Sequence, residues 1–94
     1  MPEVNQFAQP DADAAAAAYL ISFLDTLDHY PHIIEYRRLF NQRLGLAPGN
    51  RFLEVGCGIG GAAIPVAGIT GATGLVAGVD LSPAMIDVAI ERAR

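Results

Sequence analysis

The stretch RFLEVGCGIGGAAIP, residues 51–65, decides the fold of this chain. A short apolar run, interrupted by Glu54, leads into a segment with glycine at positions 56, 58, 60 and 61. Such a run predicts a buried strand over 52–55, and the apolar residues beyond the glycines predict a helix over 59–69. Glycines at the exit of a strand let a ligand approach the backbone closely. The stretch therefore predicts a strand, a ligand-binding loop and a helix.

The next part of the chain repeats the order of strand and helix. Residues 75–79 form a second apolar run, Asp80 follows it, and Ser82 is suited to cap a helix that continues over 85–94. Neither run alternates polar and apolar residues, which is typical of parallel strands covered on both faces. The order strand–helix–strand–helix predicts an α/β fold, the start of a doubly wound Rossmann-like parallel sheet.

Two helices are expected before the sheet. Residues 1–12 are polar and predict a flexible N-terminus, whereas residues 13–45 predict a helical segment. Asp13 is suited to cap a helix over 14–28, and Pro31 to open the second helix. In each helix an apolar stripe is expected to pack inward, namely Tyr19, Leu20, Phe23, Leu24 and Leu27 in the first and Ile33, Tyr36, Phe40 and Leu44 in the second.

The end of the chain falls inside a helical pattern, without a glycine or asparagine stop signal before Arg94. A single pair of strands and helices cannot cover both faces of its own sheet. We therefore expect residues 51–94 to be the partial, truncated form of a larger cofactor-binding domain.

The composition limits the classes of function. The chain has 94 residues, 52% of them hydrophobic, and a net charge of −4. This charge gives no electrostatic reason to expect nucleic acid or an anionic membrane as a partner. Residues 55–79 carry no charge, but glycines and Pro65 interrupt them, so no membrane span is expected. Cys57 is the single cysteine and cannot form an internal disulfide, which favours a reducing, cytoplasmic location. Its side chain is expected to have a packing role, and no metal site is predicted.

The position of Asp80 predicts a nucleoside ligand. Asp80 ends the second strand, 20 positions after Gly60, and parallel neighbours bring this carboxylate beside the glycine loop. A carboxylate at that place can accept hydrogen bonds from both hydroxyls of a ribose. The sequence thus predicts a cofactor that contains adenosine.

The glycines alone leave the identity of the cofactor open. Gly56, Gly58 and Gly61 fit the dinucleotide pattern G-x-G-x-x-G, whereas Gly56, Gly58 and Gly60 fit G-x-G-x-G. Glu54 favours the second interpretation, because a carboxylate would repel a pyrophosphate at the helix N-terminus. S-adenosylmethionine carries an ammonium and a sulfonium and has no phosphate, so it suits a nearby carboxylate.

The segments FLEVGCGIGG and GLVAGVDLSPAMIDVAIERAR resemble class I S-adenosylmethionine-dependent methyltransferases. In that family an acidic residue and one apolar residue precede G-x-G-x-G, and a second acidic residue closes the next strand. The resemblance covers residues 51–94 and is stronger to the branches that methylate small molecules and quinones than to those that act on nucleic acids. It implies a methyltransferase with a small-molecule methyl acceptor.

The resemblance also implies roles for individual residues, although it implies no catalytic residue and no oligomeric state. Glu54 would steer the ammonium side of S-adenosylmethionine, and Asp80 would hold the ribose hydroxyls. The positions that would line the methionine portion are Gly56, Gly58 and Gly60, and those that would flank the adenine are Leu81 and Met85.

Two other functions remain open at this stage. The ambiguous glycines are also compatible with an oxidoreductase that uses NAD(P) or FAD. A non-catalytic interaction module, in which the N-terminal helices bind partners, is the second alternative. A cofactor titration separates the methyltransferase from the oxidoreductase.

Overall fold

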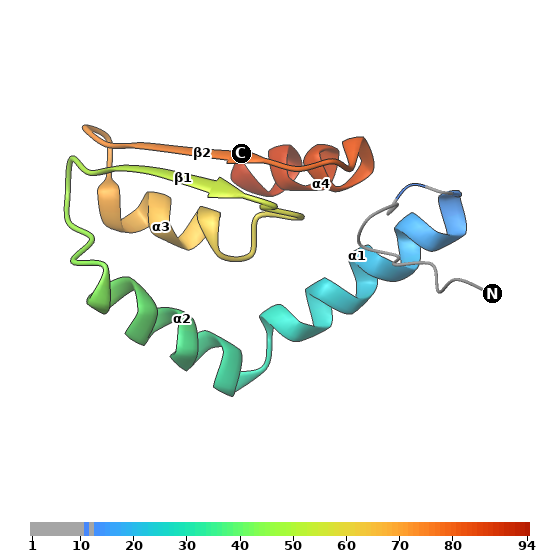
Figure 1. Ribbon diagram of the computed structural model, residues 1–94, viewed down its shortest axis with the longest axis horizontal. Helices are drawn as coiled ribbons and strands as arrows, with labels where there is room; N and C mark the ends of the chain where they lie inside the picture. Colours follow the sequence, from blue (N-terminus) through green and yellow to red (C-terminus); the bar gives the residue numbers. More distant parts are fainter. Residues whose placement is uncertain (1–10, 12) are drawn as a thin grey trace.

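The computed structural model describes residue 11 and residues 13–94 of the chain. The segment 1–12, predicted to be a flexible terminus, therefore lies outside the described residues except for Asp11. The order of elements is two helices, then strand, helix, strand and helix (Figure 1). This α/β architecture confirms the predicted start of a Rossmann-like fold.

The two strands form a parallel sheet, as predicted. β1 (Arg51–Val55) pairs with β2 (Leu75–Val79) along their whole length. The register places Glu54 opposite Gly78 and Val55 opposite Val79, so both strands end at the same edge. The loops that follow them therefore start side by side.

The N-terminal helices follow their sequence signals. α1 (Ala14–Asp28) begins after Asp13, whose side chain accepts a hydrogen bond from the backbone N–H of Ala16. α2 (Pro31–Arg43) has Pro31 at its first position, where the missing N–H costs no helical hydrogen bond. Of the described helices, none is long and apolar enough to cross a lipid bilayer.

The helix after the glycine loop begins later than the sequence predicts. α3 (Ala63–Thr70) starts four positions after Ile59, because the loop continues through turns up to Ala62. Pro65 consequently lies in the first turn of α3 and not in its second. Its missing N–H is one of the donors that have no helical partner in a first turn, so Pro65 need not bend the helix.

The last helix has two polar groups at its N-terminus. α4 (Pro83–Ala93) begins after Ser82, whose hydroxyl accepts a hydrogen bond from Met85 N at 3.1 Å, as the sequence predicts. The same hydroxyl donates to the carboxylate of Asp11, which also accepts from Ala84 N at 3.2 Å. A residue ahead of α1 thus helps to hold the start of α4.

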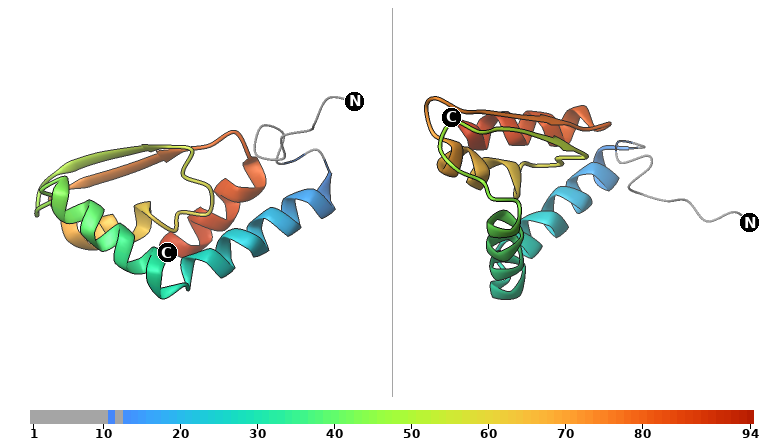
Figure 2. Two further views of the ribbon diagram at one scale, coloured as in Figure 1. Left: turned by 60° about the horizontal axis from the view of Figure 1, so that its bottom comes forward. Right: turned by 60° about the vertical axis from the view of Figure 1, so that its left-hand side comes forward.

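The four helices lie on the same side of the sheet, as the left view of Figure 2 shows. Between α3, α4 and β2 lies an open hollow of about 320 Å³, which Val76 and Gly78 line from the sheet. α2 runs beside α3, and α1 packs against α4. No described element covers the opposite face, as expected for a single pair of strands and helices, and the apolar residues of that face are exposed.

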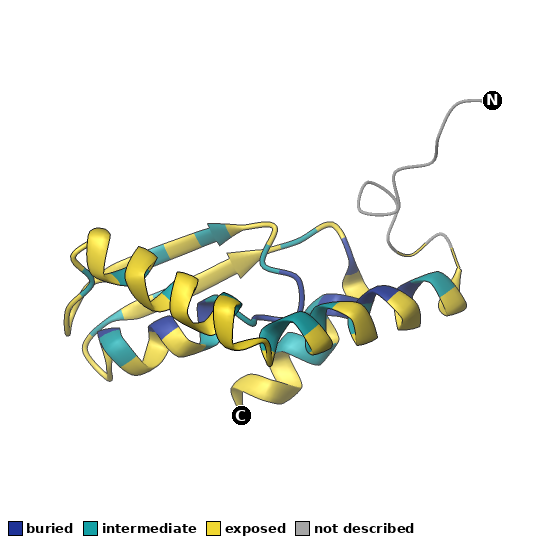
Figure 3. Ribbon diagram, turned by 90° about the horizontal axis from the view of Figure 1, so that it is seen from below, coloured by how far each residue is buried: buried dark blue, intermediate teal, exposed yellow. Residues whose placement is uncertain are grey.

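The core lies where α1, the glycine loop and α4 meet (Figure 3). Leu20, Ile59 and Met85 are each at most 3% exposed and form its centre. Ile21, Leu24 and Val88 pack against them. The N-terminal helices are therefore packed against the ligand-binding loop and are not a separate unit beside it.

The predicted stripe of α1 is confirmed for Leu20 and Leu24, which lie in or against the core, whereas the aromatic residues of both helices lie outside it. Tyr19 and Phe23 stack on each other on the outer side of α1, and Tyr36 and Phe40 do the same on α2. α2 has no buried residue, and the side that it turns to α3 contains Ile34, Arg37 and Asn41. The stripe over α2 was predicted on the wrong side.

The uncovered sheet face predicts self-association in solution. It carries Leu53, Val55, Leu75 and Val79, which are between 50% and 79% exposed. Exposed apolar strands are sites of aggregation. For the 94-residue chain by itself, we expect sedimentation velocity to show association that rises with concentration. The double variant Leu53→Thr, Leu75→Thr should reduce this association. Leu39→Gln, on the exposed side of α2, is the control, and a wild-type monomer at all concentrations would contradict the prediction.

Candidate functional site

The glycine loop has the backbone of G-x-G-x-G. Gly56, Gly58 and Gly60 have φ angles of +78°, +54° and +84°, which are strongly disfavoured for residues other than glycine. Gly61 does not have a positive φ, but a Cβ atom there would lie 2.3 Å from the carboxylate oxygens of Asp28. The first three glycines are thus required by the loop conformation, and Gly61 by the close approach of α1.

The start of the loop is fixed to the end of β2. The backbone N–H groups of Gly56 and Cys57 both donate to the carbonyl oxygen of Val79, at 2.7 and 3.0 Å. Gly60 N then donates to Cys57 O at 2.9 Å and closes a tight turn. The two strand ends therefore hold the loop in one conformation before any ligand is bound.

The Asp80 carboxylate connects the two loops that follow the strands. One oxygen accepts from Gly58 N at 2.8 Å and the other from Ser82 N at 2.9 Å. Asp80 thus lies beside the glycine loop, as expected. Each carboxylate oxygen can accept more than one hydrogen bond, so two further donors can still bind there.

A hollow of about 340 Å³ opens at this edge of the sheet. It is lined by Val55, Gly56, Val79, Asp80 and Leu81. Leu81 is 80% exposed and presents an apolar surface next to the Asp80 carboxylate. This combination of an apolar wall and a carboxylate suits a nucleoside, and the roles of Asp80 and Leu81 toward ribose and adenine stay predictions.

Glu54 lines a second, smaller cavity on the other side of Gly56. The cavity measures about 140 Å³, and Gly58, Asp28 and Arg37 also line it. Burial raises the pKa of the Glu54 carboxyl, an effect that Arg37 opposes and Asp28 reinforces. Among the described residues none donates a hydrogen bond to this carboxyl. Gly56 lines both cavities, so Glu54 and Asp80 lie in neighbouring cavities.

Met85 and Cys57 have packing roles in the structure. Met85 is 3% exposed, and its sulfur lies below Gly58, 3.7 Å from the place of an added Cβ atom. This burial indicates that Met85 supports the glycine loop. Its contact with an adenine stays a prediction. The Cys57 side chain lies over Gly78, and burial raises the pKa of its thiol, which disfavours the reactive thiolate.

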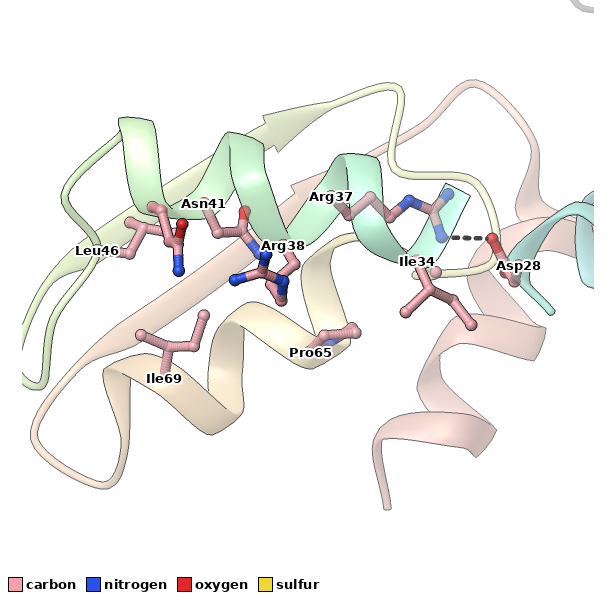
Figure 4. Close-up of a pocket in the computed structure, with 10 residues that line it drawn as sticks. Asp28, Ile34, Arg37, Arg38, Asn41, Leu46, Pro65 and Ile69 are labelled. Atoms are coloured by element: carbon pink, nitrogen blue, oxygen red, sulfur yellow. Dashed lines mark hydrogen bonds and ion pairs between the residues drawn. The ribbon is translucent and has the colours of Figure 1, made fainter. Parts of the chain in front are cut away.

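Sequence reasoning did not identify three residues of this site. Leu24 and Asp28 of α1 and Arg37 of α2 line the cavity beside Glu54. Arg37 Nη1 donates to Asp28 Oδ1 at 2.7 Å, an interaction drawn in Figure 4. Charged residues on helices usually face solvent, and no local pattern indicates that these helices fold back over a loop that comes later in the chain.

The comparisons with known proteins agree with this arrangement. The family model described as the ubiE/COQ5 methyltransferase family matches residues 24–94, which is 71 of the 94 residues. The match begins at Leu24, and it therefore includes α2, the glycine loop, Asp80 and α4. A search of curated proteins and a search of solved structures each returned no match.

Proposed function

The chain belongs to the ubiE/COQ5 methyltransferase family, a class I methyltransferase family, and on that premise we propose that it binds S-adenosylmethionine at the glycine loop for methyl transfer to a small molecule. The observation that supports this most directly is the distribution of charge around the loop. Carboxylates lie on both sides of Gly56, Glu54 in one cavity and Asp80 in the other. A cofactor with a cationic end and a ribose suits both.

The same charges are unfavourable for a dinucleotide. A pyrophosphate at the start of α3 would approach a cavity whose charged lining, Glu54, Asp28 and Arg37, carries a net charge of −1. Gly61, which completes the dinucleotide pattern in the sequence, is explained by its contact with Asp28. No specific observation favours the oxidoreductase or the interaction module over the methyltransferase.

In this proposal the protein orients the cofactor and excludes water. Asp80 accepts hydrogen bonds from the ribose hydroxyls, Glu54 attracts the ammonium, and the glycines let the methionine portion lie against the backbone. When bound, S-adenosylmethionine supplies the sulfonium that activates the methyl group. The acceptor then needs only to be placed in line with that group. α1 and α2 shield the loop through Leu24 and Arg37.

Glu54→Gln tests the role of this carboxylate, because glutamine keeps the shape and removes the charge. We expect affinity for S-adenosylmethionine to fall about ten- to hundredfold, the equivalent of roughly 1.5–3 kcal/mol for a charge-assisted hydrogen bond. The measurement is a paired calorimetric titration of wild type and variant with S-adenosylmethionine and with NAD. Binding of NAD but not of S-adenosylmethionine to the wild type would refute the methyltransferase proposal.

The same variant should have the opposite effect on the stability of the free protein. The pKa of Glu54 is raised above its ordinary value of 4.5, so the folded state holds this proton more tightly than the unfolded state. The free energy of unfolding therefore falls as the pH rises from about 4.5 through the raised value. At neutral pH Glu54→Gln should be more stable than wild type, and the difference should vanish at low pH. Equal stability at every pH would contradict the account of burial.

A further inference from the structure

The ion pair between α1 and α2 lies beside the proposed cofactor site and is partly removed from water. Asp28 is the last residue of α1, and its side chain is 14% exposed, whereas that of Arg37 is 31% exposed. In Figure 4 the two side chains meet at the end of α2 that lies close to the glycine loop. Ions lose hydration when they are buried, so a pair of this kind is costly unless its remaining hydrogen bonds are made.

One oxygen of this pair has no partner. Arg37 donates to Asp28 Oδ1, while Asp28 Oδ2 is buried and receives no hydrogen bond from a described residue. Guanidinium and carboxylate frequently pair through two parallel bonds, but Arg37 uses only one oxygen of Asp28. The unpaired oxygen therefore needs an explanation, and it belongs to a residue that lines the Glu54 cavity.

The charges around this cavity complement an amino acid with one extra positive charge. Asp28 and Glu54 contribute two carboxylates and Arg37 one guanidinium, which gives a net charge of −1. The amino-acid portion of S-adenosylmethionine has one carboxylate and one ammonium, and the adjacent sulfonium adds one positive charge. The charges of cofactor and cavity thus sum to zero, and the cavity offers a group of opposite charge to each end of the amino-acid portion.

We propose that Asp28 and Arg37 are cofactor-binding residues that recognise the amino-acid portion of S-adenosylmethionine. Arg37 pairs with its carboxylate, while Asp28 Oδ2 and Glu54 accept from its ammonium. The inference rests on the proposed function of the glycine loop, and it adds the N-terminal helices to the site. It also explains why Gly61 must lack a side chain, because a Cβ atom there would displace the Asp28 carboxylate.

The test removes charges from protein and ligand in turn. Calorimetry measures the affinity of wild type and Arg37→Gln for S-adenosylmethionine, for decarboxylated S-adenosylmethionine and for 5′-methylthioadenosine, which lacks the amino-acid portion. We expect the wild type to prefer the cofactor over its decarboxylated form by about ten- to hundredfold. Arg37→Gln should lose or reverse this preference, with its affinity for 5′-methylthioadenosine unchanged.

Two further variants control for effects on folding and on general charge. Arg38→Gln removes the neighbouring guanidinium, which pairs with exposed Glu35 from the same helix, and it should keep the preference of the wild type. Arg37→Gln leaves the buried Asp28 carboxylate without its cation. This variant is therefore compared with the double variant Asp28→Asn, Arg37→Gln. The double variant removes both charges and should lose the preference in the same way.

The outcomes separate this inference from the proposed function. A preference for the carboxylate that survives in Arg37→Gln and in the double variant overturns the inference and leaves the methyltransferase proposal standing. If folded variants lose affinity equally for all three ligands, the inference is also overturned, because this result indicates that the ion pair has a purely structural role. If the wild type binds none of the three ligands, the proposed function fails and the inference fails with it.

Discussion

Replacing Asp80 by alanine is expected to reduce affinity for S-adenosylmethionine by tenfold to more than hundredfold, because a charge-assisted hydrogen bond contributes about 1.5–3 kcal/mol. The loss has two sources. The carboxylate that would accept the ribose hydroxyls is removed, and the N–H groups of Gly58 and Ser82 lose their acceptor. The loop that would hold the methionine portion is thus loosened together with the ribose site.

Asp80→Ala should also destabilise the free protein, by about 1–3 kcal/mol for each amide that is left buried without an acceptor. The measurements are calorimetric titration and denaturant unfolding of the same preparations. Asp87→Ala is the matched control, since it removes a carboxylate from the exposed side of α4. Affinity and stability that stay within error of wild type would exclude Asp80 from both roles.

Gly74→Ala is expected to have the largest effect on folding among single methyl additions. An added Cβ atom would lie 2.7 Å from the carbonyl oxygen of Asn50 and 2.8 Å from that of Thr70. Both oxygens already accept backbone hydrogen bonds, from Leu75 N and Gly49 N, so neither can move freely. Overpacking of this kind costs about 1–3 kcal/mol or more.

The opposite result is expected for Gly68→Ala, which provides the control. Gly68 lies inside α3, and no atom lies within 4 Å of an added Cβ atom. Alanine is favoured over glycine in a helix by about 0.5–1 kcal/mol, so this variant should be more stable than wild type. Thermal unfolding of the two variants therefore gives shifts of opposite sign. A Gly74→Ala variant as stable as wild type would refute the packing of this turn.

The parts of the fold that could be predicted are those set by local chemistry. Asp13 and Ser82 start helices because their oxygens accept from nearby backbone N–H groups, and Pro31 fits a first turn. Gly49 has a positive φ of +86° in the turn before β1, where Pro48 and Gly49 favour such a geometry. Each of these signals acts over a few residues and can be recognised without knowledge of the rest of the chain.

The parts that could not be predicted depend on contacts between distant segments. The spacing of Tyr36 and Phe40 is compatible with a buried stripe, yet α2 turns Ile34 and Arg37 toward α3. Ile59 has a helical pattern around it, but the positive φ of Gly60 keeps the loop open for three more residues. Asp28 of α1 lies beside the glycine loop because Leu20 of the same helix packs on Ile59 and Met85.

The attachment of the glycine loop to β2 has a consequence for hydrogen exchange. The N–H groups of Gly56 and Cys57 bond to Val79, and that of Gly58 bonds to Asp80, so these amides are protected only while β2 is paired. The loop can then open only when the two strands also separate. The ligand site and the sheet should lose protection as one cooperative unit, at one opening free energy, and not as a mobile loop on a stable scaffold.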